Sequence, residues 1–557
     1  MTMDMFAGLG PNCMKTESEM VKSLKDEILQ AELSLLCSGG NEISADHERA
    51  LAAITSLFVD AAFSATPSRY AIGLDTGLGK TTLLATYLIT LKAKSLPLKV
   101  LVCVPNLKAM QEFRQVLLEG GFRPEEVGCK FSGGTLPFES VRDNLDDYDV
   151  LITCHARVDG SRSDWNGLVS NRTVFYDEAL KRGKVTEGIC LNLKTDVLTL
   201  SDFLPEDLRE DLSSLIAALE EAEVDEIIPL SFPEDAAYTV DRAIKEYKRV
   251  SRRNKDTFDE LVPVVSSKYD ALRNHNGNYF TFESTLPEMN NLFVLDANHS
   301  FSELSKLDRT IKILDLPKFK RFDHVSFKAA SMKLSKTAIM KTPDVYVQWA
   351  RDLVTSNAAV ICYKDMADKF PQGTNVITWG MHAGANSFAH LDTLICVGLL
   401  TMPHAVTKGH MTLVQDDLYA STDGYQKINA DEALLDLYQA VSRGASRKVF
   451  VQDGTTYACP STIYLSGKLN QPQIDLLKEV MPGCSYSLIE YDEAVSDIKE
   501  FFKSSTFDDM FHQYISVTEL KRKIPSVAAL SKSALKAVEG RLCENGFYKD
   551  GRGLVMK

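Results

Sequence analysis

Several common signals are missing from this sequence of 557 residues. Its eleven cysteines form no Cys-x-x-Cys pair or Cys/His cluster with the spacing of a zinc or iron–sulfur site, and their odd number does not indicate a disulfide framework. No apolar run approaches the roughly 18 residues that a membrane-spanning helix needs, and residues 1–19 lack the pattern of a secretory signal. These absences predict a cytoplasmic protein without a membrane partner.

An excess of positive charge is also missing. The chain has 62 Lys and Arg residues against 76 Asp and Glu residues, and its formal net charge is −14. This balance argues against a generally basic protein that coats nucleic acid, although it does not exclude a local nucleic-acid groove. Much of the negative charge is concentrated in residues 202–235, which contain twelve acidic residues and a single basic residue, Arg209.

The length predicts about three or four domains, and a content of 45% hydrophobic and 25% charged residues is typical of folded proteins. Short apolar runs alternate with helical patterns in two regions, which predicts an α/β fold with parallel sheets. The predicted parts are an N-terminal helical region (1–64), a first α/β domain (65–180), a helical insertion (181–288), a return to the first domain (289–310), a second α/β domain (311–470) and a C-terminal region (471–557).

A glycine-rich turn, GLDTGLGKTT at residues 73–82, lies between a strand pattern and a helix pattern. Glycine permits backbone angles that aim N–H groups at phosphate oxygens, and a helix N-terminus adds positive potential. The form G-x-x-x-x-G-K-T would have Gly where this chain has Leu74, but the flanks disfavour an incidental turn. The predicted nucleotide-binding residues are Thr76, Gly77, Leu78, Gly79, Lys80, Thr81 and Thr82, with Lys80 at the β and γ phosphates and Thr81 on Mg²⁺.

A second apolar run, TVFY at 173–176, ends in Asp177 and Glu178. A carboxylate at the end of a neighbouring strand is what a phosphate loop needs to orient Mg²⁺, and a second carboxylate can polarise the attacking water. Such a run is often only a solvated strand end. Its position 97 residues after Lys80, within the same α/β pattern, favours a catalytic pair.

Together these segments resemble motifs I and II of the superfamily 2 helicases and translocases, and further segments follow in that family's order. They are VLVCVPNL at 100–107 (motif Ia), VLITCHA at 150–156 (the segment that touches the nucleic-acid backbone), LDAN at 295–298 (motif III), VICYK at 360–364 (motif IV), GANSF at 384–388 (motif V, similar to some phage and plasmid helicases) and YQAVSRGASR at 438–447 (motif VI). Motif III departs from the family at Asn298, and motif VI departs at Ser442.

The resemblance implies two RecA-like domains that bind ATP between them. It implies that Gln439, with Arg443 or Arg447 as the arginine finger, senses the γ-phosphate, and the altered motif VI leaves open which arginine acts. The residues that it implies for nucleic-acid contact are Pro105, Asn106, Thr153, His155 and Asn386. The chain offers no Gln upstream of the phosphate loop to read adenine, since the corresponding residues 47–50 are HERA.

The C-terminal stretch 515–557 has nine Lys or Arg residues against four acidic residues. Its pattern of helix, turn, longer helix and glycine-containing hairpin resembles a winged helix. This pattern predicts nucleic-acid contacts by Lys532, Lys536 and Arg541 on the longer helix and by Arg552 on the wing. A basic solvated face on a protein-interaction module is the alternative.

A second basic cluster lies in the insertion, at residues 242–255. Its helical spacing predicts a stripe that follows phosphates, with Arg249 and Arg252 as contacts. Pairing with the acidic helix expected at 202–226 is an equally serious alternative.

These features predict an ATP-dependent helicase or translocase that acts on nucleic acid, with DNA favoured by the winged-helix pattern. The alternative is a nucleic-acid-binding adaptor or regulator in which the nucleotide is a switch and turnover is negligible. A protein partner could bind through the C-terminal module or the acidic insertion.

Overall fold

The computed structural model describes the chain in two compact units, taken one at a time below. Unit 1 comprises the chain up to Lys318 together with Met402–Glu432, and unit 2 comprises Phe319–Thr401 and the chain from Ala433 onward. The described residues are 11–556 without 65, 132–135, 142–143, 159–164, 182, 252–257, 259, 275–276, 284–288, 290, 381–387, 419–423, 490–497, 499–512, 531–534, 537, 540–541, 543–546 and 551–552.

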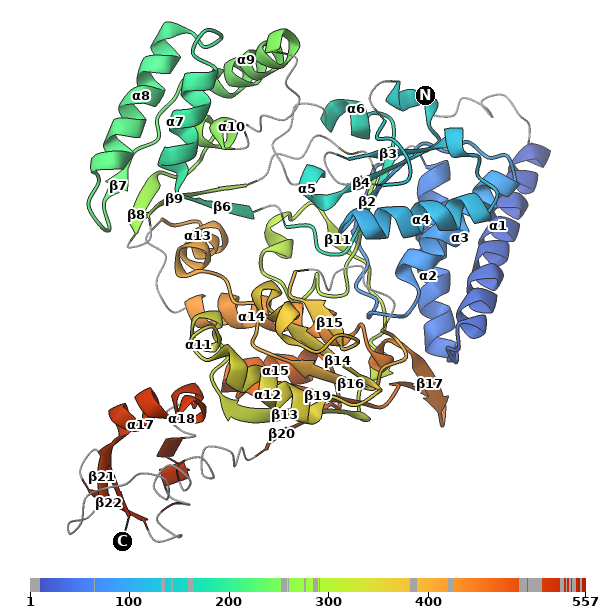
Figure 1. Ribbon diagram of the computed structural model, residues 1–557. Helices are drawn as coiled ribbons and strands as arrows, with labels where there is room; N and C mark the ends of the chain where they lie inside the picture. Colours follow the sequence, from blue (N-terminus) through green and yellow to red (C-terminus); the bar gives the residue numbers. More distant parts are fainter. Residues whose placement is uncertain are drawn as a thin grey trace. The chain divides into compact units, whose positions relative to one another are not determined.

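A seven-stranded parallel sheet forms the centre of unit 1 (Figure 1). Its strands stand in the order β11 (Lys312–Ile313), β1 (Ser68–Ala71), β10 (Asn291–Leu295), β5 (Thr173–Asp177), β2 (Val100–Val104), β4 (Val150–Cys154) and β3 (Val127–Lys130). All five residues of β2, VLVCV, are buried, as expected for a parallel strand covered on both faces. Because the strands are parallel, their carboxyl ends meet at one edge, where such sheets bind ligands.

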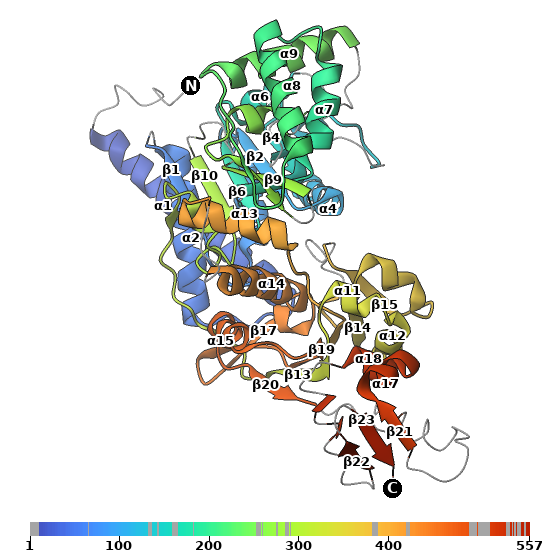
Figure 2. The ribbon, with the colours of Figure 1, turned by 90° about the vertical axis from the view of Figure 1, so that its left-hand side faces the viewer.

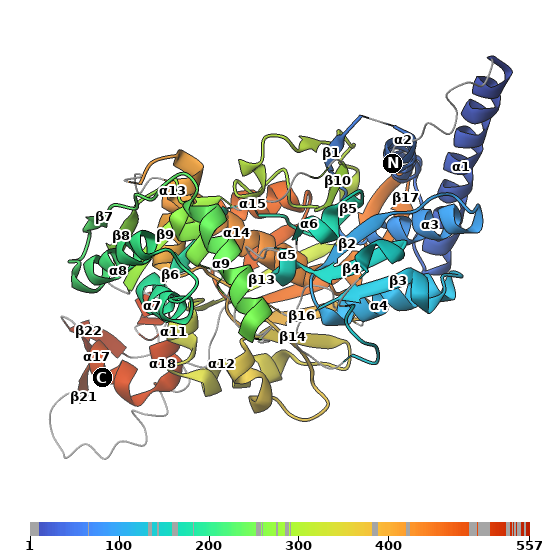
Figure 3. The same cartoon turned by 90° about the horizontal axis from the view of Figure 1, so that it is seen from above.

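Helices pack on this sheet through large apolar side chains. The longer ones are α1 (Pro11–Ser38), α2 (Ala45–Phe63), α3 (Lys80–Ala93) and α4 (Leu107–Glu119), and the short ones are α5 (His155–Val158) and α6 (Trp165–Val169). Phe58 of α2 is buried, and its ring centroid lies 4.9 Å from that of Phe175 on β5 and 5.3 Å from that of Phe293 on β10. Helix α1 packs in turn against α2 and α3 (Figure 3).

The insertion after β5 has its own sheet and its own core. The antiparallel sheet has the order β6 (Gly183–Glu187), β9 (Gly277–Glu283), β8 (Ala271–Asn274) and β7 (Ile227–Ile228). The helices are α7 (Ile189–Thr199), α8 (Glu206–Glu221), α9 (Ala236–Ser251) and α10 (Leu261–Val265). Leu193, Leu212, Val240 and Leu261, one from each helix, belong to one buried cluster. The insertion therefore contains strands as well as the predicted helices.

The segment Met402–Glu432 belongs to unit 1 although it follows strands of unit 2. Its helix α13 (His404–Gln415) packs on β6 and β9 (Figure 2). A Cβ atom on Gly409 would lie 2.5 Å from Val185 of β6 and 2.8 Å from Thr281 of β9, so glycine allows this close approach. Helix α14 (Tyr425–Val441) begins in the same segment. Its residue Glu432 accepts a hydrogen bond from Ser302 at 2.9 Å.

Unit 2 is built on a second parallel sheet. Its strands have the order β15 (Asn375–Thr378), β14 (Ala358–Cys362), β16 (Thr393–Cys396), β19 (Ser461–Gly467), β13 (Val325–Met332) and β20 (Ser485–Leu488). The accompanying helices are α11 (Lys336–Ile339), α12 (Pro343–Leu353) and α15 (Gln471–Val480). A small sheet has the order β12 (Lys320–Arg321), β18 (Thr455–Ala458) and β17 (Val449–Gln452). The predicted fold with two RecA-like α/β domains is confirmed.

The C-terminal module contains an antiparallel sheet with the order β21 (Gln513–Ser516), β23 (Gly553–Met556) and β22 (Phe547–Asp550), and helices α17 (Val517–Lys523) and α18 (Pro525–Ala529). The module contacts the end of β13, where Lys333, the residue after the strand, donates from Nζ to the Ala528 carbonyl at 2.7 Å. The winged helix remains a prediction. Among the described residues, no helix has the length and hydrophobicity required to cross a membrane.

Candidate functional site

The turn between β1 and α3 has the backbone that a phosphate loop requires. Gly77 has a φ of 82° and Gly79 a φ of 98°, both in the left-handed region that glycine adopts without a steric penalty. Gly79 is the N-cap of α3, so the helix N-terminus opens directly onto the turn. Unpaired N–H groups at such a terminus favour an anion.

Lys80 places its ammonium group inside this turn. Its Nζ donates to the carbonyls of Leu74 and Asp75, the latter at 3.3 Å. A cation held within a glycine-rich turn at a helix N-terminus provides the charge that phosphates need. The turn therefore combines the backbone geometry and the positive charge predicted from the sequence.

The next residue, Thr81, meets the end of β5. Its hydroxyl donates to the carboxylate of Asp177, with Oγ1 lying 3.0 Å from Oδ1 and 3.1 Å from Oδ2. The two residues are 96 positions apart in the sequence, so the fold brings the predicted magnesium ligands together. A hydroxyl and a carboxylate supply the hard oxygen atoms that Mg²⁺ prefers, and the pair therefore fits that ion.

Glu178 leaves the strand in an unusual conformation. Its φ of 83° lies in the left-handed region, which costs a non-glycine residue roughly 1–2 kcal/mol. Its N–H donates to the Leu295 carbonyl of β10 at 3.3 Å. Strained backbone often occurs at functional sites. The strain thus marks the residue that the sequence assigned to the attacking water.

A third carboxyl group lies at this sheet edge and had no role in the sequence analysis. Asp296 follows β10 and is fully buried. Burial raises the pKa of its carboxyl to about 6, while the Asn298 N–H and the charge of Lys80 act in the opposite direction. Within the described part of the chain, the side-chain amide of buried Asn298 has no hydrogen-bond partner. The LDAN motif contained these residues, but spacing alone did not reveal their burial.

The predicted nucleic-acid residues of domain 1 lie where β2 and β4 end. Asn106 caps α4 by accepting from the Ala109 N–H at 3.0 Å. Thr153 is buried and donates to the Lys130 carbonyl at 2.9 Å. The ring of His155 stacks on Tyr176 with centroids 4.2 Å apart. Pro105 directly follows β2 and is partly buried. Their contacts with nucleic acid remain a prediction.

Motif VI belongs to unit 2. Gln439 lies on α14 and is partly buried, Arg443 follows that helix and is 7% exposed, and Arg447 ends a short 3₁₀ helix at Ala445–Arg447. The phosphate loop belongs to unit 1. The joint action of these side chains with the loop, and the choice between the two arginines, remain predictions.

Two basic residues of the insertion pair with acidic residues of their own helix. Arg249 pairs with Glu246 at 2.5 Å and Lys245 with Asp241 at 2.6 Å, in both cases within α9. Glu220 of the acidic helix α8 instead pairs with a lysine of α7. Lys536 lies in a helical stretch of the C-terminal module and is exposed. The other predicted contacts lie outside the described residues: Arg252, Asn386, Lys532, Arg541 and Arg552.

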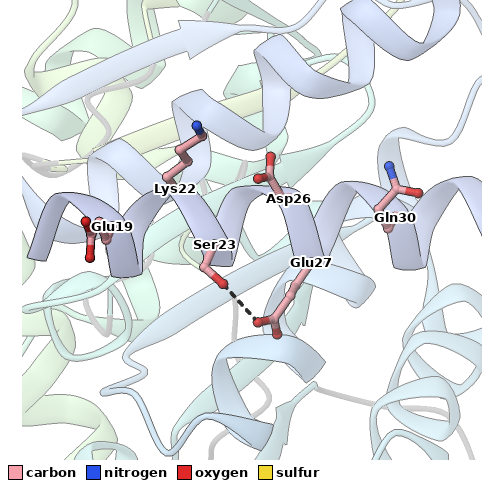
Figure 4. A pocket seen from close by; sticks show the side chains of 6 residues that line it. All are labelled: Glu19, Lys22, Ser23, Asp26, Glu27 and Gln30. Carbon is pink, nitrogen blue, oxygen red and sulfur yellow. Dashed lines mark hydrogen bonds between the residues drawn. The ribbon is translucent and has the colours of Figure 1, made fainter. Parts of the chain in front are cut away.

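A shallow depression of about 420 Å³ follows one polar face of α1 (Figure 4). It is lined by Glu19, Lys22, Ser23, Asp26, Glu27 and Gln30, and the Ser23 hydroxyl donates to Glu27 at 3.3 Å. Its lining includes none of the phosphate-loop residues. The depression is therefore separate from the candidate nucleotide site.

No family model and no curated protein matches this chain. Solved structures do match, at low similarity. Dbp5 of S. cerevisiae bound to RNA and ADP BeF3 is 10% identical, with 83% of this chain and 93% of that chain covered and a TM-score of 0.35. The DUF1998 helicase MrfA bound to DNA is 10% identical, with 95% and 62% covered and a TM-score of 0.34. E. coli DEAH/RHA helicase HrpB is 9% identical, with 88% and 49% covered and a TM-score of 0.30. Two of these three structures, MrfA and HrpB, are helicases.

Proposed function

We propose that this protein is an ATP-dependent helicase or translocase that acts on nucleic acid, with DNA as the favoured substrate. One observation supports it above all others, which is the hydroxyl of Thr81 lying 3.0 Å from the carboxylate of Asp177. The contact joins the start of the loop helix to the end of β5, which is separated from β1 by β10 in the sheet. It supports a single site built from the two separately predicted motifs.

In this proposal the chain's own groups have distinct roles. Lys80 and the backbone N–H groups of the loop bind the β and γ phosphates. Thr81 and Asp177 hold Mg²⁺, which would neutralise phosphate charge. Glu178 orients the attacking water from the strained end of β5. Each role uses a group that lies at the carboxyl edge of the unit 1 sheet or at the helix that follows it.

Unit 2 would complete the site. Charge that develops on the γ-phosphate needs a cation, and Arg443 or Arg447 would supply it when the domains close. Gln439, which lies near both arginines in the sequence, would contact the same phosphate. Hydrolysis would then be coupled to domain movement. The residues after β2 and β4, and the basic C-terminal module, would bind the nucleic-acid backbone.

The test is phosphate release by the full chain with single-stranded DNA, single-stranded RNA or duplex. We expect stimulation by nucleic acid, and Lys80→Ala should lower the stimulated rate by at least about 100-fold because transition-state charge is no longer stabilised. Lys94→Ala is the matched control, since Lys94 follows the same helix and pairs with Glu27 at the surface. Unchanged turnover in Lys80→Ala would refute the proposal.

The adaptor alternative predicts a different result in the same assay. Nucleotide and nucleic acid would both bind, and phosphate release would not rise on adding either DNA or RNA. An unwinding assay on a forked duplex then separates a helicase from an enzyme that only translocates.

A further inference from the structure

A buried carboxyl group from the N-terminal helix lies against the phosphate loop. Glu32 of α1 is 0% exposed. Its Oε1 lies 2.6 Å from the hydroxyl of Thr82, and its Oε2 lies 2.8 Å from the hydroxyl of Thr86. Both threonines are on α3, the helix that begins at the loop, and α1 runs beside α3 (Figure 3).

The hydroxyl of Thr82 has a second partner, because it also lies 2.9 Å from the carbonyl oxygen of Gly79. A hydroxyl has one proton to donate, and an ionised carboxylate has none. If Glu32 were ionised, Thr82 could satisfy either the carboxylate or the Gly79 carbonyl. The other short oxygen–oxygen contact would then have no proton.

A neutral Glu32 satisfies every contact at once. In that form its Oε1–H would donate to Thr82, the Thr82 hydroxyl would donate to the Gly79 carbonyl, and the Thr86 hydroxyl would donate to Oε2. The Gly79 carbonyl can also accept the helical hydrogen bond from Leu83 at 2.8 Å, since a carbonyl oxygen has two lone pairs. The hydrogen-bond inventory therefore assigns the proton to Glu32.

The surroundings also favour the neutral form. Burial raises the pKa of Glu32 to about 7, although hydrogen bonds that the two threonines would donate to the ionised carboxylate act in the opposite direction. Titratable groups on α1 and on the elements packed against it have other partners. Lys25 pairs with Asp60 and Glu27 with Lys94. His47 contacts the Leu78 carbonyl, and Lys80 donates to the carbonyls of Leu74 and Asp75.

The hydrogen bonds from Glu32 through Thr82 end at the peptide unit between Gly79 and Lys80, where α3 begins. In a trans peptide the C=O and N–H groups point in opposite directions. Holding the Gly79 carbonyl toward Thr82 therefore orients the Lys80 N–H toward the opposite side. Space is tight here, since a Cβ atom on Gly79 would lie 2.8 Å from Oε1 of Glu32. The carboxyl group thus packs directly on the residue whose φ of 98° shapes the loop.

We propose that Glu32 is a positioning residue for the nucleotide phosphates, acting as a neutral acid in a relay that runs from Glu32 through Thr82 to the Gly79 carbonyl. The inference rests on the nucleotide-binding part of the proposed function and does not require movement on nucleic acid. It gives the N-terminal helix a part in the site.

The test measures the dissociation constant of a fluorescent ADP for the full chain between pH 6 and pH 8.5. Glu32→Gln keeps a donor for Thr82 and an acceptor for Thr86 at every pH. We expect its affinity to equal that of the wild type at pH 6 and to exceed it about tenfold at pH 8.5, since ionised Glu32 leaves one of these buried contacts without its hydrogen bond. Comparing two proteins at one pH cancels the titration of the ligand.

Two further variants separate the relay from simple packing. Thr82→Val removes the middle hydroxyl and should weaken binding at every pH. Thr86→Val is the matched control, because Thr86 touches Glu32 but not Gly79, and binding should change less than twofold. Melting temperatures check that each variant is folded.

Two results would overturn the relay. One is a ratio of Glu32→Gln to wild-type affinity that stays constant with pH, and the other is weaker binding by Glu32→Gln at pH 6. If the wild type itself binds no nucleotide, and Lys80→Ala is indistinguishable from it, the proposed function fails as well. If the wild type binds nucleotide but the ratio of the two affinities does not change with pH, only the relay is refuted.

Discussion

Replacing Glu32 with Gln should change the stability of the protein in a pH-dependent way. The folded state raises the pKa of this carboxyl from an ordinary 4.5 to about 7 because the group is buried. A raised pKa means that the folded state holds a proton which the unfolded chain releases. The stability that comes from this retained proton is fully present below pH 4.5 and is lost as the pH rises through about 7. The difference between the two pKa values corresponds to roughly 3 kcal/mol of unfolding free energy, because a tenfold change in an equilibrium constant is worth about 1.4 kcal/mol.

Glu32→Gln is uncharged at every pH and avoids this loss. Thermal unfolding followed by circular dichroism should therefore give similar melting temperatures for both proteins near pH 5. At pH 8 the variant should melt roughly 5 °C higher, as about 3 kcal/mol predicts for a unit of this size. The assay compares the two proteins in matched buffers, so other titrating groups cancel.

Glu27→Gln on the same helix is the control. Glu27 is exposed, and its hydrogen bond with Lys94 lowers its pKa, so this variant should lose rather than gain stability, and only at pH values where the carboxylate is ionised. The reasoning about Glu32 would be wrong if the difference in melting temperature were the same at pH 5 and pH 8.

Two more predictions follow from the unit 1 contacts. Asp177→Asn should leave the fold intact and raise the Mg²⁺ concentration needed for nucleotide binding by about tenfold or more, measured by Mg²⁺ titration; an unchanged requirement would remove Asp177 from the site. Phe58→Ala should lower the free energy of unfolding by about 3–5 kcal/mol in urea titrations, because this buried ring packs on Phe175 and Phe293. A loss below about 1 kcal/mol would contradict that packing.

The candidate nucleotide site could be proposed from the sequence because its signals are local. Glycines at 77 and 79 followed by Lys80 indicate one turn, and Asp177 ends an apolar run whose place in the alternating α/β pattern favours a strand. The contact between Thr81 and Asp177 then follows from the parallel sheet, which brings the ends of separate strands to one edge.

Glu32 was missed because an acidic residue on a helix usually faces water. The sequence did contain a signal. Leu24, Ile28 and Leu36 are buried at four-residue spacing, and Glu32 occupies the remaining position of that stripe. An acid on the apolar face of an amphipathic helix needs a partner, and here the partners are hydroxyl groups 50 and 54 residues away. No local pattern identifies partners at that separation.

Other features depended on tertiary packing. Strand β7 has two residues and β8 has four, too few for a clear alternation. Gly277, the first residue of β9, has a φ of 137°. The segment Met402–Glu432 was assigned to the second domain by its position in the sequence, whereas the structure groups it with unit 1. Its close approach through Gly409 could not be read from a helical pattern.

The separate core of the insertion has a consequence for the order in which the chain folds. All the buried residues of that core lie between Ile189 and Phe280, so a ribosome synthesises every one of them before it makes β10. The seven-stranded sheet of unit 1 forms later, because β1 at Ser68 pairs with β10 at Asn291, 223 positions further along the chain. Local contacts form faster than distant ones. During synthesis, the inserted region can therefore acquire its structure while the strand that carries the phosphate loop still lacks its neighbour.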